Sequence, residues 1–360
     1  MSMGQGTLGK VKVVHLLPAL EQGGVESVVC DLVRALPCES VVVSKGGRLV
    51  KRVEAAGGRH VELDLKSKNP LTYFTRAWRI RKVLRAEKPD LVCVHSRVPA
   101  WLFVWANRPL GLKWISYAHG ANSVSRYSEV MTKGDLVVVP SKFLADYLKA
   151  NYRITDDKIR IIPNPVDTER FDPTKLDQAF IAEKRREWGI REGDHVSMAV
   201  GRITPVKGLE WLIEEVKSQT SGEGAASPLR LVIVGGADKH HQKYLKSLKE
   251  LTTALHLHLQ PTPIVIFAGA QEKIPECIAI ADEIVSGNTT KPETFGLSVV
   301  EAYAMNKPVR VARRFGGVAE VMDAVEQAGS ATLREAVLKL YGMDKFAERT
   351  TAVYREACRA

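Results

Sequence analysis

The sequence has few cysteines and no long apolar run, and both absences narrow the class of protein. Its five cysteines form no C-x-x-C pair and are odd in number, which argues against a disulfide framework and favours reduced thiols. No stretch approaches the length of a membrane span, and residues 1–10 lack the apolar core of a signal peptide. We therefore expect a cytoplasmic protein, and its 360 residues predict two domains.

Acidic residues are too few to balance the basic ones in the first half of the chain. Residues 1–170 carry 27 Lys and Arg against 16 Asp and Glu, whereas the rest carries 25 of each. The whole net charge of +11 therefore lies in the first half. This one-sided charge predicts an anionic partner, such as a membrane surface, a phosphorylated glycolipid or nucleic acid. Solubility alone is the other interpretation.

Short apolar segments alternate with helical patterns along the chain. Strands are predicted at 11–17, 40–43, 60–63, 91–95, 113–117, 136–139 and 159–162. The pattern restarts after a polar stretch, with strands at 195–200, 229–234, 264–267, 284–286 and 309–312 and a surface loop at 218–228. Such alternation predicts parallel sheets with helices on both faces. The expected fold class is α/β, with two doubly wound, Rossmann-like domains facing each other across a cleft that holds the active site.

Two glutamates with seven residues between them give the clearest functional signal. Glu293 is expected in a loop and Glu301 about one turn inside the following apolar helix, whose uncapped N-terminus exposes the amides of 294–297. Carboxylates bind sugar hydroxyls, and the positive end of a helix binds anions. A nucleotide sugar presents both groups. The passage resembles the E-x7-E signature of retaining glycosyltransferases of GT-B fold, most closely family 4.

A glycine-rich loop in the second half carries two cations. Gly201 and Gly208 bracket a segment between a strand and a helix, and Arg202 and Lys207 suit a diphosphate whose charge grows as a glycosidic bond breaks. An ordinary loop with solvated basic residues is the alternative. The segment resembles the family's G-R-x(4)-K-G element, and Gly235 resembles the glycine beside base and ribose.

Three stretches of the first half also resemble the family. Gly23 and Gly24 look like its glycine loop, in which backbone amides approach the donor phosphate. His119 follows a strand and resembles the histidine that reaches the sugar–phosphate region, although a histidine there is often a structural donor. Residues 95–101 (HSRVPAW) look like an element of transferases that build lipopolysaccharide cores and related surface glycans, and Tyr127 continues this likeness. Arg97 then faces an anionic acceptor or packs on a tryptophan.

A basic, aromatic helix face is predicted near residue 80. Its exposed side carries two aromatic and three cationic residues, namely Phe74, Trp78, Arg81, Lys82 and Arg85. Aromatic rings among cations suit a helix that lies in an anionic membrane interface. An ordinary surface helix is the alternative, and no nucleic-acid recognition module is present. We expect contact with the inner face of the cytoplasmic membrane, and no nucleic acid.

The resemblance covers nearly the whole chain and implies the following assignments. Residues 1–170 form an acceptor-binding domain, residues 171–342 a donor-binding domain, and 343–360 a helix that returns to the first. The enzyme moves a hexose-type sugar from a nucleotide-diphospho-sugar to a lipopolysaccharide-core or other surface-glycan acceptor, a glycolipid or oligosaccharide. No cofactor or metal is expected, consistent with the lack of an Asp-x-Asp motif.

The resemblance also assigns the site residues. The catalytic candidates are His119, Arg202, Lys207 and Glu293, and the acceptor-binding candidates are Arg97 and Tyr127. The donor-binding candidates are Gly23, Gly24, Gly201, Arg202, Lys207, Gly235, Glu293, Thr294, Phe295, Gly296, Leu297 and Glu301. Competing interpretations are another GT-B enzyme, such as a sugar-nucleotide epimerase or phosphorylase, and an inactive membrane- or glycolipid-binding subunit.

Overall fold

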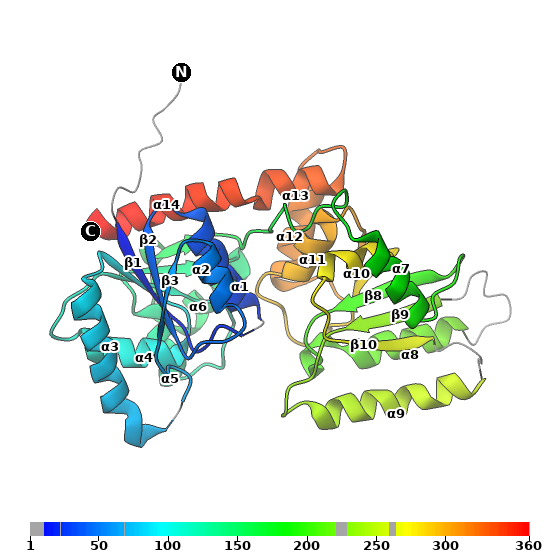
Figure 1. The fold of residues 1–360 in the computed structure, drawn as a ribbon, viewed down its shortest axis with the longest axis horizontal. Coiled ribbons are helices and arrows are strands. Elements are labelled where there is room, and N and C mark those ends of the chain that lie inside the picture. The colour runs from blue at the N-terminus through cyan, green and yellow to red at the C-terminus, as the bar shows by residue number, and fades with distance from the viewer. Residues whose placement is uncertain (1–10, 22, 68, 221–228, 259–263, 360) are drawn as a thin grey trace. The chain divides into compact units, whose positions relative to one another are not determined.

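The computed structural model describes residues 11–21, 23–67, 69–220, 229–258 and 264–359. The chain divides into two compact units, one of residues 1–165 with 341–360 and one of residues 166–340 (Figure 1). Residues 1–10, which were predicted to lack a signal peptide, and most of the predicted surface loop at 218–228 lie outside the described residues. The loop prediction was wrong for residues 218–220, because they continue a helix.

The first unit is built on a seven-stranded parallel sheet in the order β3-β2-β1-β4-β5-β6-β7. Valine-rich strands are buried on both faces, as expected when helices cover both sides of a parallel sheet. The strands are β1 (Lys12–Leu16), β2 (Glu39–Ser44), β3 (Arg59–Glu62), β4 (Leu91–Val94), β5 (Trp114–Tyr117), β6 (Leu136–Val139) and β7 (Ile159–Ile161).

Helices cover the two faces of this sheet. The apolar sides of α3 and α4 pack on one face, and α1 and the distant C-terminal helix α14 pack on the other. The helices of this unit are α1 (Gly24–Ala35), α2 (Val50–Ala55), α3 (Tyr73–Glu87), α4 (Arg97–Asn107), α5 (Arg126–Glu129), α6 (Lys142–Asn151) and α14 (Met343–Arg359).

Helix α14 is held against the sheet of the first unit by apolar and polar contacts. The fully buried Tyr354 hydroxyl accepts hydrogen bonds from the Cys93 thiol (3.3 Å) and the Tyr117 hydroxyl (3.2 Å). Arg160 on β7 pairs with Glu356. The last turns of the chain therefore complete the core of the first unit.

The second unit contains a five-stranded parallel sheet in the order β10-β9-β8-β11-β12, so both units are doubly wound α/β structures as predicted. Its strands are β8 (His195–Val200), β9 (Leu229–Val234), β10 (Val265–Gly269), β11 (Glu283–Ser286) and β12 (Val309–Val311). Its helices are α7 (Gln178–Glu187), α8 (Leu209–Thr220), α9 (Gln242–His258), α10 (Ile274–Ile280), α11 (Leu297–Ala304), α12 (Gly316–Gln327) and α13 (Leu333–Tyr341).

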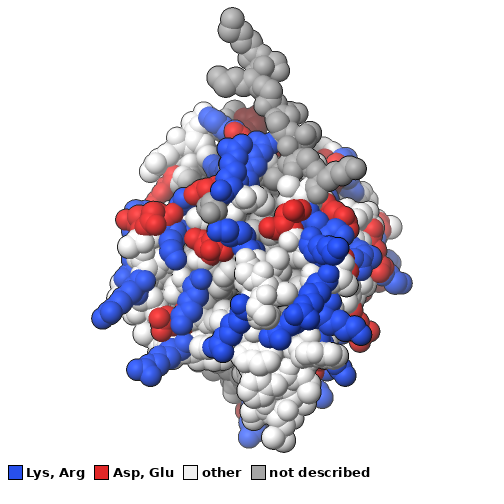
Figure 2. All heavy atoms as spheres, turned by 90° about the vertical axis from the view of Figure 1, so that its left-hand side faces the viewer, with Lys and Arg blue, Asp and Glu red and all other residues white. Residues whose placement is uncertain are grey.

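One side of the first unit combines basic and large apolar side chains. Figure 2 views this side and shows Lys and Arg spread around an uncharged area at its lower end. Leu71, Phe74 and Trp78 are 87%, 60% and 57% exposed. Arg81, which was predicted on the exposed face, is half-buried, and its Nε donates to the Ala106 carbonyl (3.0 Å). None of the helices in the described ranges carries an apolar stretch long enough to cross a membrane.

Candidate functional site

The loop after β8 carries the predicted cations at the carboxyl ends of the strands of the second sheet. Gly201 has φ +146° and Gly208 has φ +60°, backbone conformations that favour glycine. Between them a short 3₁₀ turn (Pro205–Lys207) brings the Lys207 side chain back over Gly201, where an added Cβ would lie 3.2 Å from the lysine Cε. Arg202 is exposed and forms no ion pair with any described residue. The loop thus presents two cations at the carboxyl end of β8.

Lys207 reaches the first glutamate of the predicted pair. Its Nζ lies 2.7 Å from the Oε1 of Glu293, and both side chains are about three-quarters buried, with 26% and 21% exposed. The two loops touch through backbone atoms, since a Cβ on Gly208 would lie 2.0 Å from the carbonyl oxygen of Gly287. Glycine at both positions therefore permits the approach that brings the ammonium group to the carboxylate.

The loop that carries Glu293 is shaped by Asn288, which the sequence analysis missed, and by a contact with α12. The buried Asn288 donates from Nδ2 to the Lys291 carbonyl (2.5 Å), and its Oδ1 accepts from the Thr290 and Lys291 amides. The Gly317 amide of α12 donates to the Glu293 carbonyl (2.8 Å). An asparagine after a strand that caps its own loop is a recognisable turn signal, whereas the contact with α12 is tertiary.

Helix α11 begins as the spacing predicts. Leu297 is its first residue, and the preceding Gly296 has φ +95° and provides no side-chain cap. Gly296 therefore contributes no capping side chain to the first amides of this helix, and Glu301 lies one turn further on. Phe295 is 4% exposed, so its ring lies in the core. Thr294 is only partly buried.

A small cavity and a glycine contact complete this half of the site. The cavity has a volume of about 20 Å³, room for about one water, and is lined by Gly201, Arg202, Lys207, Ser286 and Ser298 among others. A Cβ on Gly235 would lie 1.8 Å from the Gly201 carbonyl oxygen. The loops after β8 and β9 therefore pack backbone to backbone, which requires glycine at 235.

In the first unit, the predicted glycine loop opens α1. Gly23 is the N-cap residue and Gly24 the first residue of the helix. The Glu26 carboxylate folds back against Gly23, since an added Cβ there would lie 2.4 Å from its Oε2. An acid thus occupies the space beside the amides that were predicted to approach a phosphate.

His119 lies in a row of histidines at the carboxyl ends of neighbouring strands. Its Nε2 is 3.1 Å from the Nδ1 of His95, and the Nε2 of His95 is 3.1 Å from the Nδ1 of His15. Burial lowers the pKa of His15 and of His119 to about 4 and that of His95 well below its usual range. The three imidazoles are therefore neutral at pH 7. The sequence analysis missed His15 and gave His95 no role of its own.

Arg97 and Tyr127, the two acceptor-binding candidates, lie together. The guanidinium of Arg97 lies over the Tyr127 ring (5.4 Å) and its Nη1 donates to the Ser128 hydroxyl (3.1 Å). The ring beneath the Arg97 guanidinium is therefore that of Tyr127. Trp101 instead donates from Nε1 to the Tyr127 carbonyl (2.9 Å), and Tyr127 is 41% exposed.

Comparison with known proteins decides the family. The model of "Glycosyltransferase Family 4" matches residues 22–170, and that of "Glycosyl transferases group 1" matches residues 180–338. The chain belongs to the family 4 glycosyltransferases of GT-B fold. A lipopolysaccharide 1,2-N-acetylglucosaminetransferase of Salmonella typhimurium is 24% identical to this glycosyltransferase over 71% of the chain and 63% of its own length.

Solved structures share the fold of this glycosyltransferase. A glycosyltransferase from Rickettsia africae superposes with a TM-score of 0.81 at 24% identity, covering 97% of this chain and 99% of its own. HepE from Anabaena, solved with UDP and glucose, superposes with a TM-score of 0.78 at 18% identity, covering 95% and 99%. At these identities the likeness concerns the fold.

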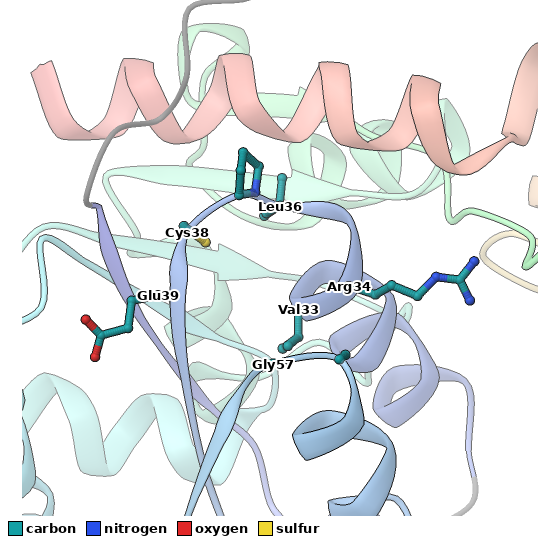
Figure 3. Close-up of a pocket in the computed structure, with 8 residues that line it drawn as sticks. Val33, Arg34, Leu36, Cys38, Glu39 and Gly57 are labelled. Atoms are coloured by element: carbon teal, nitrogen blue, oxygen red, sulfur yellow. The ribbon is translucent and has the colours of Figure 1, made fainter.

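A larger cavity lies in the first unit of the glycosyltransferase and is lined by none of the predicted site residues. It has a volume of about 420 Å³ and lies at the amino end of β2, lined by Val33, Arg34, Leu36, Cys38, Glu39 and Gly57 among others (Figure 3). The Arg34 and Glu39 side chains extend to opposite sides in this view, so they form no charged cluster. In doubly wound sheets ligands bind at the carboxyl ends of the strands, where the predicted residues lie.

Proposed function

We propose that this glycosyltransferase moves a hexose-type sugar from a nucleotide-diphospho-sugar to a lipopolysaccharide-core or other surface-glycan acceptor, with retention of configuration. The observation that carries the proposal is the Lys207–Glu293 pair beside the uncapped start of α11. An ammonium group, a carboxylate and helix amides in one place suit a leaving diphosphate and the hydroxyls of its sugar. The similarity to the Salmonella lipopolysaccharide transferase supports the acceptor class.

The predicted site residues of the second unit have the following roles in this proposal. Lys207 and Arg202 stabilise the diphosphate as it leaves, and Glu293 with the amides of 295–297 holds the sugar hydroxyls. Glu301 accepts hydrogen bonds from the ribose. In the native pair Lys207 neutralises Glu293, so a bound diphosphate competes with the glutamate for this cation.

The chemical step needs no basic side chain. The acceptor hydroxyl attacks the anomeric carbon on the face of the leaving group, the new C–O bond forms and the bond to the diphosphate oxygen breaks. The proton of the hydroxyl goes to the departing phosphate oxygen. The protein supplies fixed charges around that oxygen, which cost no reorganisation during the step. In the first unit, His119 supports the sugar phosphate. The Gly24 amide does so once the phosphate displaces the Glu26 carboxylate that lies beside this glycine loop.

A donor screen followed by a product assay tests this function. We expect one class of nucleotide sugar to raise the melting temperature, since a ligand of the native state stabilises it. Release of nucleoside diphosphate that requires the acceptor supports transfer. Release without acceptor, with an epimerised or phosphorylated sugar as product, favours another GT-B enzyme. No binding of any nucleotide sugar, together with binding to lipid, favours an inactive docking subunit.

We also propose that the basic side of the first unit contacts an anionic membrane, where a glycolipid acceptor is embedded. Leu71, Phe74 and Trp78 are exposed apolar groups at the start of α3, and no acidic residue occurs between Asp64 and Glu87. Rings at the head-group level with cations above them give both apolar burial and attraction to anionic lipid. The exposed Arg79, Lys82 and Arg85 supply this charge.

Vesicle sedimentation tests the membrane contact. We expect the protein to bind vesicles that contain phosphatidylglycerol more tightly than phosphatidylcholine vesicles, and to dissociate as salt is raised. Phe74→Ser with Trp78→Ser should weaken binding at least about tenfold, because apolar area is lost from the interface. Trp211→Ser, at an exposed tryptophan of the second unit, is the matched control. If the double variant and the Trp211→Ser control lose vesicle binding equally, or if neither loses any, the proposed membrane surface is contradicted.

A further inference from the structure

A basic, glycine-rich loop follows β2 in the first unit, and the proposed chemistry gives it no role. The loop has the sequence KGGRL and runs from Lys45 to Leu49, between β2 and α2. It lies at the carboxyl ends of the parallel strands, where doubly wound sheets bind their ligands. Strand β2 pairs with β1, and the segment after β1 leads to Gly23 and Gly24.

Backbone contacts fix this loop against the segment that follows β1. The Lys45 amide donates to the Pro18 carbonyl (3.2 Å), and the Leu20 amide donates to the Gly46 carbonyl (2.9 Å). A Cβ on Gly47 would lie 2.5 Å from the Leu20 carbonyl oxygen, so the close approach requires glycine. The shape of the loop is therefore set by the fold.

The turn in this loop leaves two successive amides bare. The buried Ser44 hydroxyl accepts from the Gly46 amide (3.1 Å) and lies 2.9 Å from the Nε2 of His60, which fixes the start of the turn. The next two amides, of Gly47 and Arg48, have no hydrogen-bond partner among the described residues. Successive amides in a turn form a small concave site that binds anions.

Two cations flank the bare amides. Lys45 and Arg48 are exposed, and neither forms an ion pair with a carboxylate in the part of the chain that the structure describes. Asp64 is near Lys45, but its carboxylate caps the amides of residues 66 and 67 instead. An ammonium group, a guanidinium group and two amides suit a phosphate, whose oxygens accept several charge-assisted hydrogen bonds.

We infer that residues 45–48 form a subsite for a phosphate group, and that this phosphate belongs to the acceptor glycan. The link to the acceptor rests on the proposed function, whereas the anion site does not. A phosphorylated acceptor also matches the positive charge of the first half of the chain. A lipid head group has the same chemistry, but Leu49, the one large apolar residue of the loop, is half-buried and packs against the core. The loop therefore lacks an exposed apolar group to place among lipids.

Titration of the full-length ¹⁵N-labelled protein with sodium phosphate tests the anion site. We expect the amide signals of Gly47 and Arg48 to shift and to saturate, while that of Gly57, in the turn before β3, stays in place. Lys45→Gln with Arg48→Gln should weaken phosphate binding at least about tenfold, as the loss of charge-assisted hydrogen bonds predicts. Equal shifts with sodium chloride at the same ionic strength, or unchanged phosphate binding in the double variant, overturn the site.

Arg153→Gln with Lys158→Gln is the matched control. This double variant removes the same two charges, and both residues are exposed in the segment between α6 and β7, at the amino end of that strand. Phosphate binding should equal that of the wild type. An equal loss in the control shows that net charge alone attracts the phosphate, which overturns the site.

Steady-state kinetics test the link to the acceptor. With a phosphorylated glycan acceptor, Lys45→Gln with Arg48→Gln should raise the acceptor KM at least about tenfold and change kcat less than about threefold, because the loop binds a group remote from the reacting hydroxyl. After phosphatase treatment of the acceptor, the wild type and the double variant should have the same KM. An equal KM on the phosphorylated acceptor, or an acceptor that carries no phosphate, overturns the assignment.

These outcomes are distinguishable from a failure of the proposed function. If the wild-type protein transfers no sugar, that function fails, and the phosphate titration still decides the anion site. If the double variant loses binding to phosphatidylglycerol vesicles and keeps its affinity for the acceptor, the phosphate is that of a lipid, and the link to the acceptor is overturned.

Discussion

Replacing Lys207 by alanine removes the cation that meets Glu293 in the second unit. Its Nζ lies 2.7 Å from the carboxylate, and the side chain is 26% exposed, so water screens it only in part. A unit charge about 4 Å from another contributes about 4 kcal/mol at the effective dielectric constant of a protein surface. Since about 1.4 kcal/mol corresponds to a tenfold change in rate, this sets an upper limit near a thousandfold.

We therefore expect Lys207→Ala to lower turnover of the nucleotide sugar between about a hundredfold and a thousandfold. The melting temperature should fall moderately, because the substitution leaves the largely buried Glu293 carboxylate without its cation. The assay is release of nucleoside diphosphate in the presence of acceptor, at saturating donor.

Lys217→Ala is the matched control for this prediction. Lys217 also forms an ion pair on the second unit, with Glu214 at 3.5 Å, but it lies on the far turns of α8 and is 48% exposed. Its loss should change turnover less than about twofold. Turnover of Lys207→Ala within threefold of wild type would refute the reasoning, because the Lys207 ammonium would then not stabilise the leaving diphosphate.

Three further predictions concern stability. In denaturant titrations, Gly208→Ala should destabilise the second unit by at least about 2 kcal/mol, because its Cβ would lie 2.0 Å from the Gly287 carbonyl oxygen. The control Gly329→Ala has the same φ of +60° but lies in open space, so it should cost only about 1 kcal/mol. Burial lowers the pKa of His15 from 6.5 to about 4, so the unfolded chain binds the extra proton. The free energy of unfolding is therefore highest above about pH 6.5 and falls towards pH 4, by about 2 kcal/mol at pH 5. In urea titrations, the His15→Asn variant should lose less stability than the wild type between pH 7 and pH 5. Tyr354→Phe should cost about 1–3 kcal/mol in thermal unfolding, because two buried polar partners lose their acceptor.

Local patterns predict much of the fold. Strand positions follow from short valine-rich runs, and the helix at 73–87 follows from apolar residues at helical spacing, because side-chain periodicity depends only on local geometry. Glu293, Gly296 and Glu301 were placed correctly around the start of α11 for the same reason. The hydrogen bond from Arg81 to the Ala106 carbonyl of α4 was not predicted, because it joins segments that the helical period does not relate.

Sequence alone determined that this chain has two α/β units and that acids, cations and glycine turns follow particular strands. The tertiary structure decided which of these groups meet. Lys207 and Glu293 are 86 positions apart, and only the close approach of two glycine-bearing loops brings them together. The histidine row combines residues from three strands, and Tyr354 joins the core of the first unit from the end of the chain. Contacts of this kind depend on the order of strands in a sheet, which no local pattern encodes.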